Sequence, residues 1–223
     1  DNETKKPLGG GKFGLYAGEI LCDTKGNVLC GKDQQIAAAV SDANGEAVFD
    51  ADLPLGIYYV KELEAPAGYV KDETPVKIDL GAGIPEKVAA QISEREELEL
   101  TVDPDGSNVM YLTVSDIQTT VEISKQDVTD CAEIPGAKLT VFDEQEHIVD
   151  TWTSGEKPHS IRGLEPGHAY ILREETAPFG YVVAEDVTFT VENTGEVQPV
   201  HMFDKHAMGQ LRIEKRDKKT DQL

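Results

Sequence analysis

Apolar and polar residues alternate along short stretches of this chain, with the period of two that is typical of β-strands. The run Val187-Thr-Phe-Thr-Val191 shows this pattern, and similar runs lie between turn signals such as Asn-Gly, Pro-Gly and Thr-Gly. Short strands separated by regularly spaced turns are typical of β-sandwiches. No helical pattern alternates with the strands, as it does in α/β proteins. The pattern therefore predicts an all-β fold of sandwich type.

A long motif occurs twice. Residues 58–69 read Tyr-Tyr-Val-Lys-Glu-Leu-Glu-Ala-Pro-Ala-Gly-Tyr, and residues 170–181 read Tyr-Ile-Leu-Arg-Glu-Glu-Thr-Ala-Pro-Phe-Gly-Tyr. Shorter segments recur in the same order, among them Leu53-Pro-Leu-Gly56 with Leu164-Glu-Pro-Gly167, Gly10-Gly-Lys-Phe13 with Gly136-Ala-Lys-Leu139, and Val121-Glu-Ile-Ser-Lys125 with Leu211-Arg-Ile-Glu-Lys215. Self-similarity at a long period indicates tandem modules.

The repeats predict three parts. Residues 1–118 form a first module that lacks its N-terminal strand, residues 119–207 form a complete second module, and residues 208–223 hold the first strand of a following module. The first module is longer because of an insert near residues 82–108. Part of this insert has helix propensity, so a short helix or an irregular flap is expected there.

Composition excludes several partners. The chain has 21 Lys and Arg residues against 42 Asp and Glu residues, which gives a net charge of −21. Such a charge repels nucleic acid and anionic membranes. No apolar run approaches the ~20 residues of a membrane span. The chain begins at Asp1 without a signal peptide, so we expect it to be a fragment of a longer protein.

Neither the cysteines nor the histidines of the sequence indicate a specific chemical function. Cys22 and Cys30 flank a hairpin turn signal, and both a disulfide and a pair of free thiols remain open because the strand register is unknown. The histidines show no metal-ligand spacing. We therefore expect neither a metal nor a cofactor.

Several strands carry a charge on the face that is otherwise apolar. Residues i, i+2 and i+4 of a strand share one face, and on this face the apolar series ends in Lys125, Glu174 and Asp204 in the second module. The equivalent charges elsewhere are Glu62 and Asp116 in the first module and Lys215 near the C-terminus. These groups either lie at strand ends and extend to water, or are buried and must be paired.

Burial would give the second module a reactive set. A lysine and a carboxyl group that are buried together favour their neutral forms. The Lys125 amine is then a nucleophile, and the carbonyl carbon of a protonated Asp204 is its electrophile. Glu174 would polarise that carbonyl and move protons. The product is an amide between the two side chains, formed once and without turnover, so we do not expect an enzyme.

These motifs resemble the Cna B-type, or SpaA-type, domains of sortase-anchored pilins and adhesins of Gram-positive bacteria. The residues that carry the resemblance are the repeated Glu-x-x-Ala-Pro-x-Gly-Tyr box, Ile-x-Lys-x-Asp, Gly-Ala-x-Leu and Leu-x-Pro-Gly. The resemblance implies tandem prealbumin-like, Ig-like β-sandwiches, an extracellular place on the cell wall, and a self-formed isopeptide bond between the first and last strands. Lys125, Glu174 and Asp204 match the family's bonded pair and acidic catalyst.

The first module departs from this pattern. The position that matches Lys125 falls ahead of Asp1, although Glu62 and Asp116 are present. Lys12 aligns with Lys138 and is therefore a poor substitute. Lys215 lies on a strand of the missing type. It begins the next module, or it adds to the first module of a neighbouring copy by strand addition.

Two functions remain open at this stage. The first is a structural stalk segment of a pilin or adhesin, with neighbouring modules and sortase-linked pilin subunits as partners. The alternative is an adhesin domain that recognises a host protein or glycan, either through an exposed aromatic patch or through the insert at residues 82–108.

Overall fold

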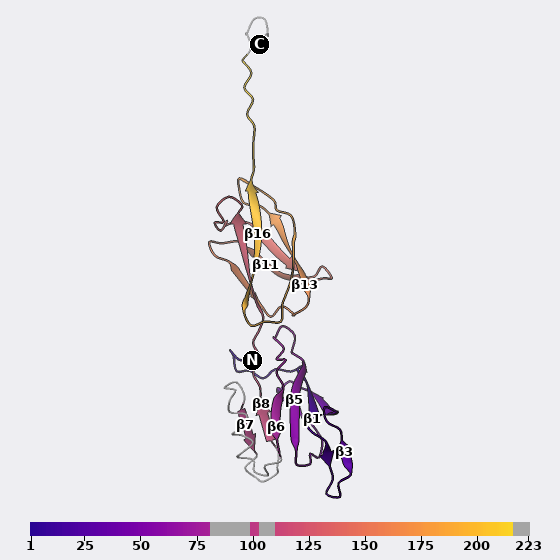
Figure 1. Ribbon diagram of the computed structural model, residues 1–223. Coiled ribbons are helices and arrows are strands. Elements are labelled where there is room, and N and C mark those ends of the chain that lie inside the picture. Colours follow the sequence, from indigo (N-terminus) through magenta and orange to yellow (C-terminus); the bar gives the residue numbers. More distant parts are fainter. Residues whose placement is uncertain (81–98, 103–109, 216–223) are drawn as a thin grey trace. The chain divides into compact units, whose positions relative to one another are not determined.

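The computed structural model describes residues 1–80, 99–102 and 110–215. These residues form strands, turns and bridges and contain no helix, which confirms the all-β prediction. They divide into two compact units, one of which holds residues 1–121 and the other most of the residues from Glu122 on (Figure 1). The helix expected near residues 82–108 lies largely outside the described residues. The predicted boundaries at residues 118 and 207 remain predictions.

The first unit is built on one four-stranded sheet with the strand order β4-β1-β5-β6. Its strands are β1 (Lys12–Ala17), β4 (Gln35–Val40), β5 (Ile57–Glu64) and β6 (Val76–Asp79). Two hairpins add β2 (Leu21–Cys22) with β3 (Val28–Cys30), and β7 (Glu99–Val102) with β8 (Met110–Thr113). Leu15, Tyr58 and Ile78 belong to a core against which Leu112 and Val114 pack.

The second unit has two four-stranded sheets (Figure 1). One has the order β11-β10-β13-β15 and contains β10 (Lys138–Phe142), β11 (Ile148–Thr153), β13 (Ala169–Thr176) and β15 (Val187–Thr190). The other has the order β12-β9-β16-β14 and contains β9 (Thr120–Asp127), β12 (His159–Arg162), β14 (Tyr181–Val182) and β16 (Val197–His206). Ile123 and Met202 from one sheet and Leu139 and Leu172 from the other are buried. Each such side chain contributes about 1.5–3 kcal/mol through burial.

The sequence repeat is visible as a structural repeat. Phe13 on β1 pairs with Glu62 on β5, and Leu139 on β10 pairs with Glu174 on β13 in the same way. The repeated Ala-Pro-x-Gly-Tyr segment forms the same turn in both units. Gly68 and Gly180 have φ angles of 79° and 91° there, which only glycine adopts readily. The box is therefore conserved between the units as a turn that follows the central strand.

The structure decides between the two alternatives for Cys22 and Cys30. Cys22 is in register with Val28 rather than with Cys30, and both cysteines are free thiols in the structure.

Residues 207–215 form no strand, and Leu211 is 87% exposed. The first strand of a following module thus remains a prediction from the sequence. No helix with the length and apolarity of a membrane span occurs in the described part of the chain.

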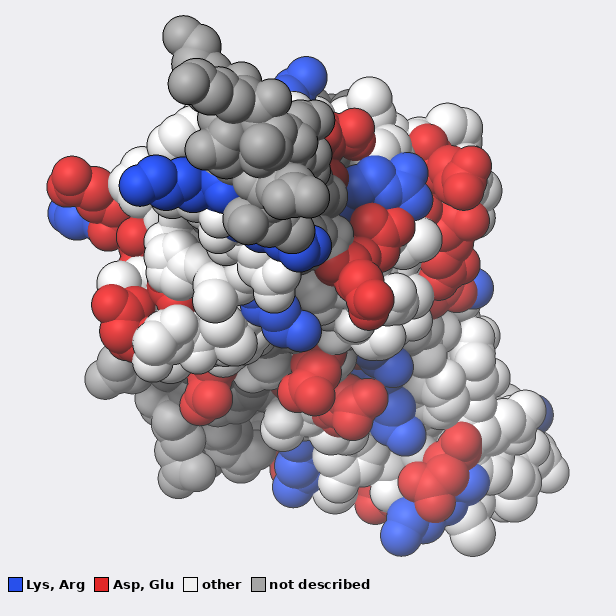
Figure 2. All heavy atoms as spheres, turned by 90° about the horizontal axis from the view of Figure 1, so that it is seen from above, with Lys and Arg blue, Asp and Glu red and all other residues white. Residues whose placement is uncertain are grey.

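The surface carries the acidic excess without a basic patch on the face shown in Figure 2, where red and blue side chains are interspersed. Among the described residues on that face no groove of positive charge for a nucleic-acid backbone is visible. This distribution agrees with the net charge of −21.

Candidate crosslink site

Three strands of the second unit bring Lys125, Glu174 and Asp204 together. Lys125 lies on β9, Glu174 on β13 and Asp204 on β16, so the two sheets both contribute. On β13 and β16 the buried residues alternate with more exposed ones up to the charge, as in Val200, Met202 and Asp204, whereas on β9 Ser124 is buried as well as Ile123 and Lys125. The alternation of strand faces thus carries all three charges into the core.

The three groups are in close contact and are shielded from solvent. Lys125 Nζ contacts Asp204 Oδ1 directly and lies 3.1 Å from Glu174 Oε1. Lys125, Glu174 and Asp204 are 1%, 4% and 0% exposed. The alternative in which these side chains extend from strand ends to water is therefore wrong for the second unit.

Backbone hydrogen bonds hold the three groups in place. The amide of Ala184 donates to Glu174 Oε2 at 2.7 Å, which fixes one oxygen of that carboxyl group. The amide of Val128 donates to the Asp204 carbonyl at 3.0 Å, and the amide of Ile134 donates to the Lys125 carbonyl at 2.7 Å. A preorganised arrangement of this kind lowers the entropy that a reaction between the groups must lose.

The surroundings of Asp204 shift its acid–base equilibrium toward the protonated form. Burial raises the pKa of Asp204 above its usual range, the adjacent Lys125 lowers it in part, and the nearby Glu174 carboxyl group raises it further. A carboxylic acid is the form whose carbonyl carbon accepts a nucleophile, because a carboxylate carbon repels it.

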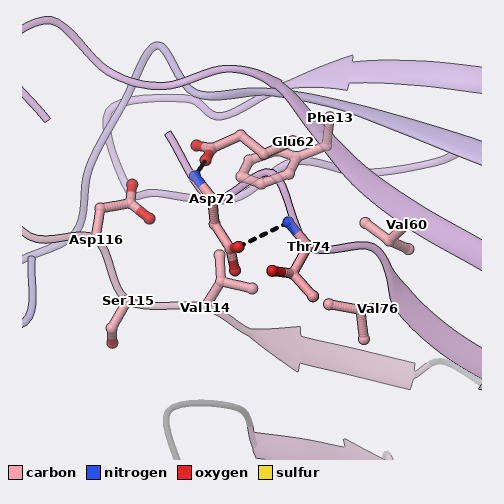
Figure 3. A pocket seen from close by; sticks show the side chains of 9 residues that line it. All are labelled: Phe13, Val60, Glu62, Asp72, Thr74, Val76, Val114, Ser115 and Asp116. Atoms are coloured by element: carbon pink, nitrogen blue, oxygen red, sulfur yellow. Dashed lines mark hydrogen bonds between the residues drawn. The ribbon is translucent and has the colours of Figure 1, made fainter. Parts of the chain in front are cut away.

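The first unit has the acidic half of the same site. Glu62 on β5 and Asp116, which follows β8, line a cavity of about 30 Å³ together with Phe13, Val60, Asp72, Thr74, Val76, Val114 and Ser115 (Figure 3). The amide of Asp72 donates to Glu62 Oε2 at 2.7 Å. Burial raises the pKa of Glu62 to about 7 and also raises that of Asp116.

The other lysines considered from the sequence do not reach either site. Lys12 forms an ion pair with Glu64 at 2.8 Å, with a side chain that is 40% exposed, so it does not take the role of Lys125 in the first unit. Lys215 is exposed in the segment that follows β16. The structure therefore assembles a complete triad in the second unit and a pair of acids in the first.

Comparison with known proteins identifies the family. The family model described as the SpaA prealbumin-like fold domain matches residues 1–93 and 119–206. This chain belongs to that family. The match confirms the prealbumin-like fold expected for both SpaA domains, and no curated protein matches the chain.

Several solved structures are similar to this chain. The Bacillus anthracis TIE protein is 24% identical with a TM-score of 0.44, over 92% of this chain and 32% of its own, so this chain spans about a third of that protein. The C-terminal fragment of the pilus adhesin SpaC from Lactobacillus rhamnosus GG is 17% identical with a TM-score of 0.48, over 92% and 91%. The shaft pilin spaA from the same organism is 15% identical with a TM-score of 0.38, over 93% and 88%.

A polar cluster beside the triad of the second SpaA domain was missed from the sequence. Tyr181 Oη donates to Asp127 Oδ2 at 2.9 Å, and His206 Nε2 lies 2.8 Å from the same oxygen. The Tyr181 and His206 rings stack with centroids 4.6 Å apart. The cluster ties β9, β14 and β16 together next to Lys125. The Lys-x-Asp spacing and the last tyrosine of the repeated box were the available signals.

Proposed function

We propose that the second SpaA domain forms an amide between Lys125 and Asp204, and that the chain is thereby a structural stalk segment of a Gram-positive surface pilin or adhesin. The observation that carries this proposal is the contact of Lys125 Nζ with the Asp204 carboxyl group in a dry core beside Glu174. Neighbouring modules, and sortase-linked pilin subunits, are the expected partners at the cell wall.

The reaction needs only these three groups. The neutral Lys125 amine attacks Cγ of the Asp204 carboxylic acid, and Glu174 donates a proton to the oxygen on which negative charge develops. The tetrahedral intermediate loses one oxygen as water and one proton from nitrogen, which restores Glu174. One amide and one water are formed from one amine and one acid. The step occurs once per chain, and no turnover follows.

The crosslink would change how the domain responds to force. Lys125 and Asp204 lie 79 residues apart in sequence and on neighbouring strands β9 and β16. Force that enters at β9 and leaves at β16 would then pass through a covalent bond, and the sandwich between them would stay folded. Such a unit suits a stalk that holds a cell to a surface under shear.

The adhesin alternative has no specific support from the described residues. Trp152, the aromatic residue considered for glycan binding, stacks on His159 with ring centroids 4.2 Å apart, so one face of its ring is already covered. The insert at residues 82–108 lies largely outside the described residues. The stalk is therefore the function that we propose.

Single-molecule extension tests the stalk directly. The chain is pulled from its two ends, and the contour length released by the second domain is compared with that of Glu174→Ala. We expect no release from residues 125–204 in the parent chain and full release in the variant. A reversible extension of the parent domain through those residues would refute the proposal.

A further inference from the structure

The two domains differ at one edge of their corresponding sheets. In the first domain β4 is the edge strand beside β1, and in the second domain β11 is the edge strand beside β10. Ser41 and Ser154 follow these edge strands, and the amide of each donates at 2.8 Å to the carbonyl of the residue just ahead of the neighbouring strand. Each serine hydroxyl also accepts a hydrogen bond from the amide of that same residue. Three residues before each serine, Ala38 on β4 therefore corresponds to Thr151 on β11.

The backbone of Ala38 and Val40 faces away from the sheet. In an antiparallel pair, residues that hydrogen-bond to the neighbouring strand alternate with residues whose N–H and C=O groups point away from it. Because Ser41 bonds toward the β1 side, Ala39 and Ala37 do so as well, and both are in register with β1. Within the described part of the chain β4 pairs with β1 alone. The outward donors and acceptors of Ala38 and Val40 are therefore available to another strand.

The second domain covers the corresponding edge with a charged side chain. The Thr151 amide, which points outward in the same way, donates to Asp150 Oδ1 at 2.7 Å, and His159 Nε2 lies 2.8 Å from Asp150 Oδ2. A charge on an edge strand opposes pairing with another chain. The first domain has Ala37 at the position of Asp150, and no residue of Gln35–Val40 is charged. The edge of β4 therefore lacks the protection that the edge of β11 has.

We propose that β4 pairs with β4 of a second copy of this chain, antiparallel and across a two-fold axis beside Ala38. Ala38 of each copy then lies opposite Ala38 of the other, and the two residues exchange a pair of N–H···O bonds. The contact joins the two four-stranded sheets into one continuous sheet. A two-fold contact of this kind uses the same surface on both copies and closes on itself.

The charges that flank β4 favour a second copy in this orientation. Lys32 lies ahead of the strand and Asp42 follows it, and both are exposed. Antiparallel pairing brings the Lys32 end of each copy to the Asp42 end of the other, whereas parallel pairing would place like charges together. Asp33, beside Lys32, offsets part of this attraction. The net charge of −21 repels at longer range, and physiological salt screens it beyond about 8 Å.

The contact is small, so it should be reversible. β4 has six residues, which corresponds to a length of about 20 Å. A single pair of such strands buries less surface than the roughly 1,200 Å² at which stable interfaces begin. We therefore expect the dimer to form at high protein concentration and to dissociate on dilution.

Amide hydrogen exchange of the full chain, measured by NMR at increasing concentration, tests the contact residue by residue. Sedimentation equilibrium gives the fraction of dimer in the same samples. The amides of Ala38 and Val40 should exchange rapidly in the monomer and become protected in the dimer, while those of Ala37 and Ala39 stay protected throughout because they bond to β1. A chain that remains monomeric with Ala39 protected, or a dimer in which Ala38 still exchanges freely, would overturn the proposal.

Charge substitutions test the partner and the register. Ala38→Lys places two lysines opposite each other and should weaken dimerisation by about tenfold or more. Thr151→Lys adds the same charge at the corresponding exposed position of the second domain and should dimerise like the parent chain. An equimolar mixture of Ala38→Lys and Ala38→Glu should restore a mixed dimer, because opposite charges then face each other.

Protection of the Ala39 amide confirms in each variant that the first domain is folded. Dimerisation that Ala38→Lys leaves unchanged, or that Thr151→Lys weakens equally, would place the contact on another surface and contradict the proposal. Failure of the mixture to form a mixed dimer would also contradict it, since Ala38 would then not face Ala38.

Discussion

Replacing the acid beside the proposed amide should separate crosslinked from uncrosslinked protein. Glu174→Gln keeps the size and most of the packing of a side chain that is 4% exposed, but it removes the proton donor. The Lys125–Asp204 pair then remains two separate side chains. We expect this variant to retain the fold and the full mass of its sequence.

The expected loss of stability in Glu174→Gln follows from the length of the loop that the Lys125–Asp204 amide closes. For residues 79 apart in sequence, the chain-entropy relation used for disulfides gives about 4.5 kcal/mol of stabilisation. Loss of that amount corresponds to a fall in melting temperature of roughly 20 °C or more for a domain of this size. An imperfect fit of the buried side-chain amide in Glu174→Gln lowers the stability by about 1 kcal/mol more.

Trp152 provides the assay because it is the only tryptophan of the chain and lies on β11 of the second domain. Its fluorescence during urea unfolding reports on that domain, and Glu175→Gln, at an exposed neighbouring position, is the matched control. The control should unfold like the parent chain. Equal midpoints for Glu174→Gln and the parent would refute the reasoning, since no crosslink would then contribute to stability.

Three further predictions concern individual contacts. Burial raises the pKa of Glu62 from 4.5 to about 7, so the folded first domain holds this proton more tightly than the unfolded chain. The contribution of Glu62 to the free energy of unfolding should therefore be fully present below about pH 4.5 and be lost, by about 2 kcal/mol after allowance for solvent screening, as the pH rises through 7. Hydrogen exchange of the parent chain and of Glu62→Gln at several pH values measures this contribution. The same pH dependence of stability in both proteins would contradict it. Tyr181→Phe leaves a buried oxygen of Asp127 with one donor fewer and should cost about 1–2 kcal/mol in the tryptophan assay. Gly180→Ala forces a φ of 91° on alanine and should cost about 1–2 kcal/mol, whereas Gly155→Ala, at an open position without positive φ, should be neutral; equal effects would contradict the turn assignment.

Strand periodicity made the three core charges predictable. Because side chains alternate strictly along a strand, Lys125, Glu174 and Asp204 could be placed on the core face from their apolar neighbours alone. The sequence could not show whether these three side chains are shielded from solvent, since their exposure depends on how far each strand continues under the opposite sheet. The repeated box predicted the common turn because Gly68 and Gly180 need a positive φ.

Contacts between strands were less predictable. The cluster of Asp127, Tyr181 and His206 joins residues from three strands, and its formation depends on a register that no local pattern states. The same limit applies to Cys22 and Cys30, because a slip of one residue in a hairpin changes which side chains face each other. The two acids of the first domain were evident from the repeat, whereas the cavity beside them depends on the packing of Phe13 and Val114.

An accurate intact mass of the purified chain tests the central claim most directly. We predict a mass lower than that of the sequence by one water, together with a proteolytic fragment in which Lys125 and Asp204 are joined, and a full mass in Glu174→Ala. A full mass for the parent chain, with the second domain folded, would contradict the account, because the triad would then hold an ion pair and no covalent stalk would exist.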